Sequence, residues 1–164
     1  MIPCPRTFAG KETYIDDNGV TIYRWYRPEW RGNYTLTIRF ISSHSPQPQG
    51  IWLLYTQDFC GSLFMNGEKL KPRKRLFDHY LFSEDYFPER EFTLRVESTC
   101  GGLILSNTSQ RPNSTTWGAG YFGYAMWVET IGENHYRFHC NDFDYDDDFD
   151  DLIFDIIVTI VSHA

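Results

Sequence analysis

Apolar and polar side chains alternate with a period of two residues along most of this chain, and no segment has a convincing helical period. Residues 20–26 and 34–41 show the alternation most clearly. Successive side chains of a β-strand point to opposite faces, so the pattern is typical of strands with one buried face. Helices interleaved with strands would indicate a parallel sheet, and they are missing here. We therefore expect an all-β fold, a jelly-roll-like antiparallel β-sandwich of about eight to ten strands.

The clearest turn lies at Asn66-Gly67, between two alternating segments. This pair is preferred in two-residue type I′ hairpins because both positions need a positive φ. A loop with two prolines and a glycine interrupts the alternation at 45–50, and a polar loop is expected at 106–116. Only the stretch 71–88 could hold a short helix.

Length and composition restrict the class of protein. The 164 residues suit one domain, 1–164. With 41% apolar and 18% aromatic residues the chain is too hydrophobic to be disordered, and four cysteines are too few for a disulfide-dense miniprotein. The cysteines are far apart in the sequence and are expected to be buried free thiols. Most aromatic residues are expected to fill the core between the sheets.

Negative charge is concentrated near the end of the chain. Eight aspartates and no Lys or Arg lie between positions 142 and 155, and the rest of the chain carries 14 acidic against 15 basic residues. Carboxylates crowded in this way favour a cation as partner. The alternating aspartates would gather on one side of an extended loop or around the centre of a bent one. They are Asp142, Asp144, Asp146, Asp148 and Asp150.

Ca²⁺ is the cation that suits such a loop best. It accepts six to eight oxygens in flexible geometry, whereas Mg²⁺ requires an octahedron and keeps its waters. The loop is not an EF-hand, because Asp147 stands where that motif needs Gly and Ile153 stands where it needs Glu. A solvated acidic loop is the alternative interpretation. The interleaved Phe143, Tyr145 and Phe149 argue against it, because they would hold the loop on the fold.

The segment 148–155, Asp-Phe-Asp-Asp-Leu-Ile-Phe-Asp, resembles the closing D-[FY]-[ND]-D-[LV]-[VI]-F signature of a family of calcium-associated β-rich domains. These domains, of unassigned function, occur in bacterial adhesins and secreted repeat proteins. The resemblance covers about 20 residues and implies a jelly-roll-like sandwich with Ca²⁺ beside the last strand and a binding role. It carries over Asp148, Asp150 and Asp151 as metal ligands. Asp142, Asp144 and Asp146 are added from their spacing alone.

A weaker resemblance links residues 63–70 and 92–96 to the sugar-binding jelly-roll modules that accompany glycoside hydrolases. A sugar packs its C–H face on an aromatic ring while its hydroxyls need hydrogen-bond partners. Trp117, in a polar loop flanked by glycine, and Tyr145, inside the acidic loop, are the candidate ligand-binding residues. The primary hypothesis is a lectin-like module that binds Ca²⁺ and carbohydrate.

Two other functions remain open. The acidic loop could dock a basic partner surface in an assembly, and a pair of its carboxylates could hydrolyse glycosides. No catalytic motif is found, so we assign no catalytic residue. The basic cluster 69–75 is expected to guard a sheet edge rather than to bind nucleic acid. No membrane span or signal peptide is expected, which implies a cytoplasmic protein if the chain is complete and an extracellular one if it is trimmed.

Overall fold

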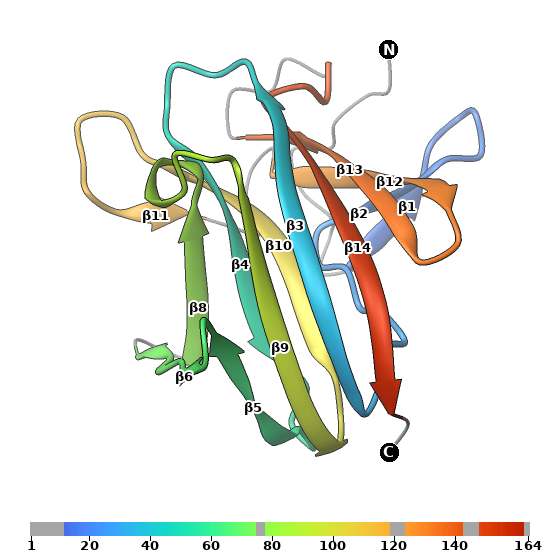
Figure 1. Cartoon of the computed structure of the whole chain (residues 1–164). Coiled ribbons are helices and arrows are strands. Elements are labelled where there is room, and N and C mark those ends of the chain that lie inside the picture. The colour runs from blue at the N-terminus through green and yellow to red at the C-terminus, as the bar shows by residue number, and fades with distance from the viewer. Residues whose placement is uncertain (1–11, 75–77, 119–123, 143–147, 163–164) are drawn as a thin grey trace.

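Two antiparallel β-sheets pack face to face in the computed structural model of this chain, and the larger sheet is strongly curled (Figure 1). The structure describes residues 12–74, 78–118, 124–142 and 148–162. Every strand pairing among these residues is antiparallel. The prediction of an all-β antiparallel sandwich is therefore confirmed.

Within the described residues the larger sheet has nine strands. In spatial order they are β1 (Thr13–Ile15), β2 (Thr21–Tyr23), β12 (Ala125–Gly132), β13 (His135–Asn141), β14 (Leu152–Ser162), β3 (Asn33–Ser43), β9 (Glu91–Cys100), β5 (Cys60–Met65) and β6 (Glu68–Lys69). The smaller sheet has five. They are β11 (Trp117–Gly118), β10 (Leu103–Gln110), β4 (Gln49–Tyr55), β8 (Asp78–Ser83) and β7 (Arg73–Lys74).

The strand count exceeds the predicted eight to ten because several edge strands are only two or three residues long. Short edge strands limit unwanted pairing with other chains. The hairpin prediction is confirmed, since Asn66 (φ 52°) and Gly67 (φ 80°) join β5 to β6. In the stretch 71–88, where the sequence left room for a short helix, a 3₁₀ turn, η1, runs over Glu84–Tyr86. No helix among the described residues has the length and apolar character needed to cross a membrane.

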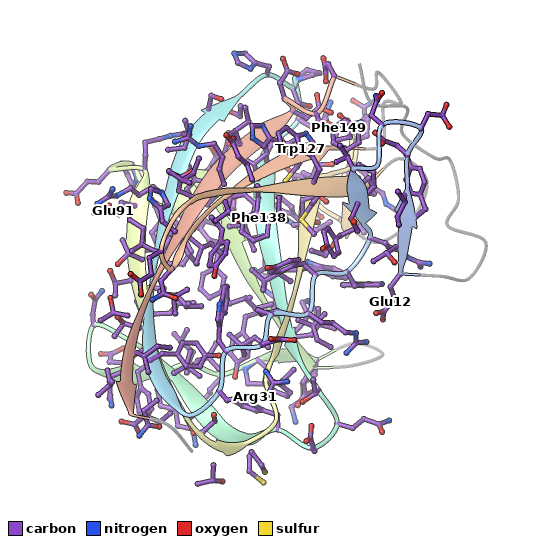
Figure 2. The ribbon with its side chains drawn as sticks, turned by 90° about the vertical axis from the view of Figure 1, so that its right-hand side faces the viewer. Glu12, Arg31, Glu91, Trp127, Phe138 and Phe149 are labelled. Atoms are coloured by element: carbon purple, nitrogen blue, oxygen red, sulfur yellow. The ribbon has the colours of Figure 1, made fainter. Side chains whose placement is uncertain are left out.

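The core lies between the sheets and follows from the alternation. In β3 the side chains of Tyr34, Leu36, Ile38 and Phe40 are buried, whereas those between them are more exposed. Figure 2 shows Phe138 of β13 between the sheets, and its ring stacks on that of Phe154 at a centroid distance of 4.7 Å. Each large apolar side chain buried in this way stabilises the fold by about 1.5 to 3 kcal/mol.

Charged side chains of alternating sign cross the outer face of the larger sheet. Five directly paired residues form this charge ladder over β12, β13, β14, β3 and β9: Glu129, Arg137, Asp155, Arg39 and Glu91. Asp155 is buried, with 3% exposure, and accepts hydrogen bonds from Arg137 Nε at 2.7 Å and Nη2 at 3.1 Å. His135 Nε2 lies 2.7 Å from the same carboxylate. Asp155, although it is part of the acidic run, therefore belongs to the ladder.

Candidate functional site

Three of the predicted metal ligands come together just before β14. One carboxylate oxygen from each of Asp148, Asp150 and Asp151 lies within 4.8 Å of the others, so the three residues could hold a metal ion. Exposure falls along the chain from Asp148, which is exposed, through Asp150, which is half-buried, to Asp151, which is buried. We call these residues the aspartate triad. It is open to solvent on one side and fixed to the protein on the other.

Phe149 anchors the triad from within. Its side chain is buried against Ile22 and Ala125, and Figure 2 shows it near Trp127. The backbone of Phe149 has a φ of 56°, which is uncommon for a bulky residue. Its N–H donates to Oδ1 of Asn141 at 2.6 Å. The buried ring and this hydrogen bond offset the cost of the left-handed turn that separates Asp148 from Asp150.

Asp151 is fixed through both its main chain and its side chain. Its carbonyl oxygen accepts from the N–H of His44 at 3.1 Å, in the loop between β3 and β4. Its Oδ2 accepts from the N–H of Asp142 at 2.8 Å. A carboxylate that accepts a backbone hydrogen bond keeps further lone pairs for other partners. Asp151 is thus a preorganised oxygen donor at the inner end of the triad.

Mutual repulsion makes the triad costly without positive charge. Two carboxylates about 5 Å apart repel by roughly 3 kcal/mol at an effective dielectric constant near 20, and by about 1 kcal/mol in bulk water. Burial raises the pKa of Asp150, and the neighbouring Asp148 carboxyl raises it further. Asp150 Oδ1 is buried and has no hydrogen-bond partner in the described part of the chain. His44 lies beside the triad among the described residues, with its Nδ1 3.7 Å from Asp150 Oδ2.

Asp142 contacts the triad through its main chain, whose N–H donates to Asp151 Oδ2. Asp142 is fully buried, and its Oδ2 accepts from Ser45 Oγ at 2.5 Å and from Gln49 Nε2 at 3.2 Å. Its carboxylate thus belongs to a buried polar network that joins the end of β13 to the start of β4 and the segment before it. Asp144, Asp146 and Tyr145 lie outside the described residues.

This buried polar network was not predicted from the sequence. Asn107 of β10 is fully buried and donates through Nδ2 to the carbonyl of Asn141 at 2.6 Å. The expected loop at 106–116 was wrong in its first part, since β10 continues to Gln110. Polar side chains of β10 are buried where they form hydrogen bonds with neighbouring segments. Ser109 Oγ, for example, lies 2.7 Å from the hydroxyl of Tyr124. The inner surface of the sandwich therefore changes from apolar to polar at the end that supports the triad.

Trp117 lies at a groove of about 330 Å³ on the smaller sheet. The groove is lined by Trp52, Arg73, Lys74, His79, Leu81, Thr115, Thr116 and Trp117. Trp52 is buried, but its neighbours Ile51 and Leu53 point into the main core, so Trp52 belongs to a smaller apolar cluster on the other face of the sheet. It packs with Leu81, and its ring centroid is 4.8 Å from that of His79. The groove therefore has an aromatic floor, with hydroxyl and cationic side chains around it.

A second pocket, of about 450 Å³, is formed largely by the segment between β2 and β3. Tyr23, Tyr26, Trp30 and Tyr136 supply aromatic walls, and Arg27, Glu29 and Arg31 supply charge. Burial raises the pKa of Tyr26 to about 12, and the nearby Tyr23, Tyr136 and Glu29 add to the shift. Sequence reasoning missed this pocket because it assigned strand aromatics to the core.

Comparisons of this chain with protein-family models, with curated proteins and with solved structures find no match. The geometry of the aspartate triad, of the groove at Trp117 and of the second pocket therefore has to indicate the function.

Proposed function

We propose that this protein is a Ca²⁺-binding recognition module whose ligand is a carbohydrate. The observation that carries the metal part is the aspartate triad, in which three carboxylate oxygens lie within 4.8 Å of one another on a turn anchored by the buried Phe149. Positioned carboxylates of this kind lose less conformational entropy on binding an ion than free ones would.

Several features favour Ca²⁺ over other cations. All three side chains offer hard oxygen donors, and the described group contains no thiolate or imidazole of the kind that transition metals prefer. Ca²⁺ tolerates irregular coordination by carboxylates, main-chain carbonyls and water. Positive charge at the triad would also neutralise the repulsion among the carboxylates and give the buried Asp150 Oδ1 a partner. The resemblance of 148–155 to a calcium-associated signature agrees with this choice.

Calorimetric titration with CaCl₂ tests the metal proposal. We expect the unaltered protein to bind with measurable heat and the Asp150→Asn variant to bind at least tenfold more weakly, because one ligand oxygen and one charge are lost. Asp17→Asn, in an exposed turn near β1, removes an equal charge elsewhere and serves as the matched control. Equal binding by the two variants, or no heat at millimolar Ca²⁺, would contradict the proposal.

We assign the carbohydrate to the groove at Trp117. Aromatic rings provide the flat surface on which a sugar ring packs, and the hydroxyls of Thr115 and Thr116 with the imidazole of His79 supply polar contacts. Among the described residues no contact is found between Trp117 and the triad. We therefore propose separate roles, in which the ion stabilises the fold at one end and the groove binds the ligand.

Replacing Trp117 by alanine should weaken carbohydrate binding about tenfold or more, since burying an aromatic face is worth about 1.5 kcal/mol or more. Screening on a glycan array, followed by titration of the best soluble glycan, measures the effect. Tyr136→Ala removes an aromatic side chain from the second pocket and is the matched control. If Tyr136→Ala abolishes binding while Trp117→Ala does not, the ligand lies in the second pocket and the assignment to the groove is wrong.

A further inference from the structure

Two cysteines face each other across neighbouring strands of the larger sheet. Cys60, the first residue of β5, is the direct antiparallel partner of Cys100, the last residue of β9. Both thiols are free and exposed, whereas Cys140 is buried. The expectation of buried thiols is therefore wrong for Cys60 and Cys100, which lie exposed at the ends of their strands. Figure 1 shows these strand ends together at the lower end of the molecule.

Direct antiparallel partners have the separation that a disulfide needs. In a regular ladder such partners have Cα atoms about 4.5 to 5.5 Å apart, within the range of about 4.4 to 6.8 Å found in disulfides. The register of β5 and β9 shifts between Cys60 and Gly61, so the cysteine pair lies directly beside this irregularity. A hydrogen bond between the two side chains raises the pKa of the Cys60 thiol, which indicates that the sulfur atoms are close. Cys100 Sγ also donates to the carbonyl of Asp58 at 2.9 Å, so it is held at the start of β5.

Two glycines keep the backbones in this close approach. A Cβ atom at Gly61 would lie 2.2 Å from the carbonyl oxygen of Glu97 on β9. Gly101 follows Cys100 with a φ of +71°, and a Cβ there would lie 2.5 Å from the backbone of Phe59. Larger residues at these positions would push the strand ends apart. A glycine follows each of the two cysteines, which supports a fixed pair of facing thiols.

We propose that Cys60 and Cys100 form a reversible disulfide by exchange with a small disulfide such as oxidised glutathione. The thiolate of one cysteine attacks a sulfur of oxidised glutathione and releases one glutathione, which leaves a mixed disulfide. The thiolate of the second cysteine then attacks the protein sulfur and releases the other glutathione. The protein loses two electrons and two protons, and oxidised glutathione gains them as two reduced molecules.

The bond would close a loop that contains β6, β7, β8 and η1. This segment leaves the larger sheet at β5 and β6, contributes β7 and β8 to the smaller sheet, and returns as β9. A cross-link at its base restricts the unfolded chain, and by the chain-entropy relation a loop of this length stabilises the folded state. We expect the melting temperature of the oxidised protein to be roughly 5 to 10 °C higher.

The experiment uses the full chain with Cys4→Ser, so that Cys60, Cys100 and the buried Cys140 are the cysteines present. After incubation with oxidised glutathione, intact mass should fall by about 2 Da, because two hydrogens leave. Peptide mapping should give a peptide linking Cys60 to Cys100. Dithiothreitol should reverse both the mass change and the rise in melting temperature.

Cys60→Ser and Cys100→Ser variants are the matched controls, and each should show one glutathione adduct and no rise in melting temperature. The proposal is overturned if the protein with both cysteines carries two glutathione adducts without an internal link. A link to Cys140, or a disulfide between two molecules, would overturn it as well.

Discussion

Replacing Asp155 by asparagine should lower the free energy of unfolding by about 3 kcal/mol. We expect no other proposed substitution to reduce stability as much. The carboxylate is buried at the centre of the charge ladder and holds both Arg137 and His135. Loss of its charge leaves Arg137 without its anionic partner in a partly buried position. Urea unfolding monitored by fluorescence measures the change.

Glu91→Gln is the control for Asp155→Asn. Glu91 ends the same ladder and pairs with Arg39, but both side chains are about half exposed. Exposed ion pairs contribute about 0 to 1 kcal/mol. If Glu91→Gln costs as much as Asp155→Asn, burial is not what makes the central carboxylate important.

The Asp155 contribution should also depend on pH in a defined direction. Burial alone raises the pKa of this carboxyl, but the hydrogen bonds and charges of Arg137 and His135 outweigh burial and lower it. A carboxyl whose pKa is lower in the folded state stabilises the protein above its unfolded pKa, about 3.9, and loses this contribution as the pH falls through the folded pKa. The stability difference between the unaltered protein and Asp155→Asn should therefore shrink below about pH 4.

Calcium should raise the melting temperature by roughly 5 to 10 °C at a concentration a hundred times its dissociation constant. Binding to the folded state alone contributes about 2.7 kcal/mol under that condition, and 1 kcal/mol shifts the melting temperature of a chain of this size by roughly 2 to 4 °C. Asp148→Asn should remove most of the shift with little effect on the metal-free protein, because Asp148 is exposed. Differential scanning calorimetry measures both.

Controls separate a specific Ca²⁺ site from general screening of charge. NaCl at matched ionic strength should give a much smaller shift, since screening weakens repulsion without adding a ligand. Equal shifts with NaCl and CaCl₂ would instead favour the acidic loop as a general electrostatic surface that docks a basic partner.

Most of the fold could be predicted from local patterns. The period of two identified the strands, and Asn66-Gly67 identified a hairpin, because both signals depend on neighbours in the sequence. The face that a strand buries could not be predicted in the same way. Trp52 is buried on the face of β4 that points away from the larger sheet, and Asn107 is buried on the face of β10 that points toward it. Tertiary packing decides which face the larger sheet covers.

The grouping of three aspartates could also be predicted from the local sequence, but the surroundings of Asp142 could not. Asp148, Asp150 and Asp151 come together because they are neighbours on one anchored turn. The carboxylate of Asp142 instead accepts hydrogen bonds from Ser45 and Gln49, which precede it by 97 and 93 residues. Spacing within the acidic run carries no information about such distant partners. The facing of Cys60 and Cys100 depends likewise on strand register, which no local motif reveals.

A high-resolution crystal structure of the protein grown with Ca²⁺ tests the metal site most directly. We expect a spherical density peak for an ion that Asp148, Asp150 and Asp151 bind. Six to eight oxygens in all should surround the ion at about 2.3 to 2.6 Å. Anomalous scattering at a long wavelength would identify the ion as calcium. Carboxylates that point apart into solvent, with no such peak at millimolar Ca²⁺, would contradict the proposal that this turn is a calcium site.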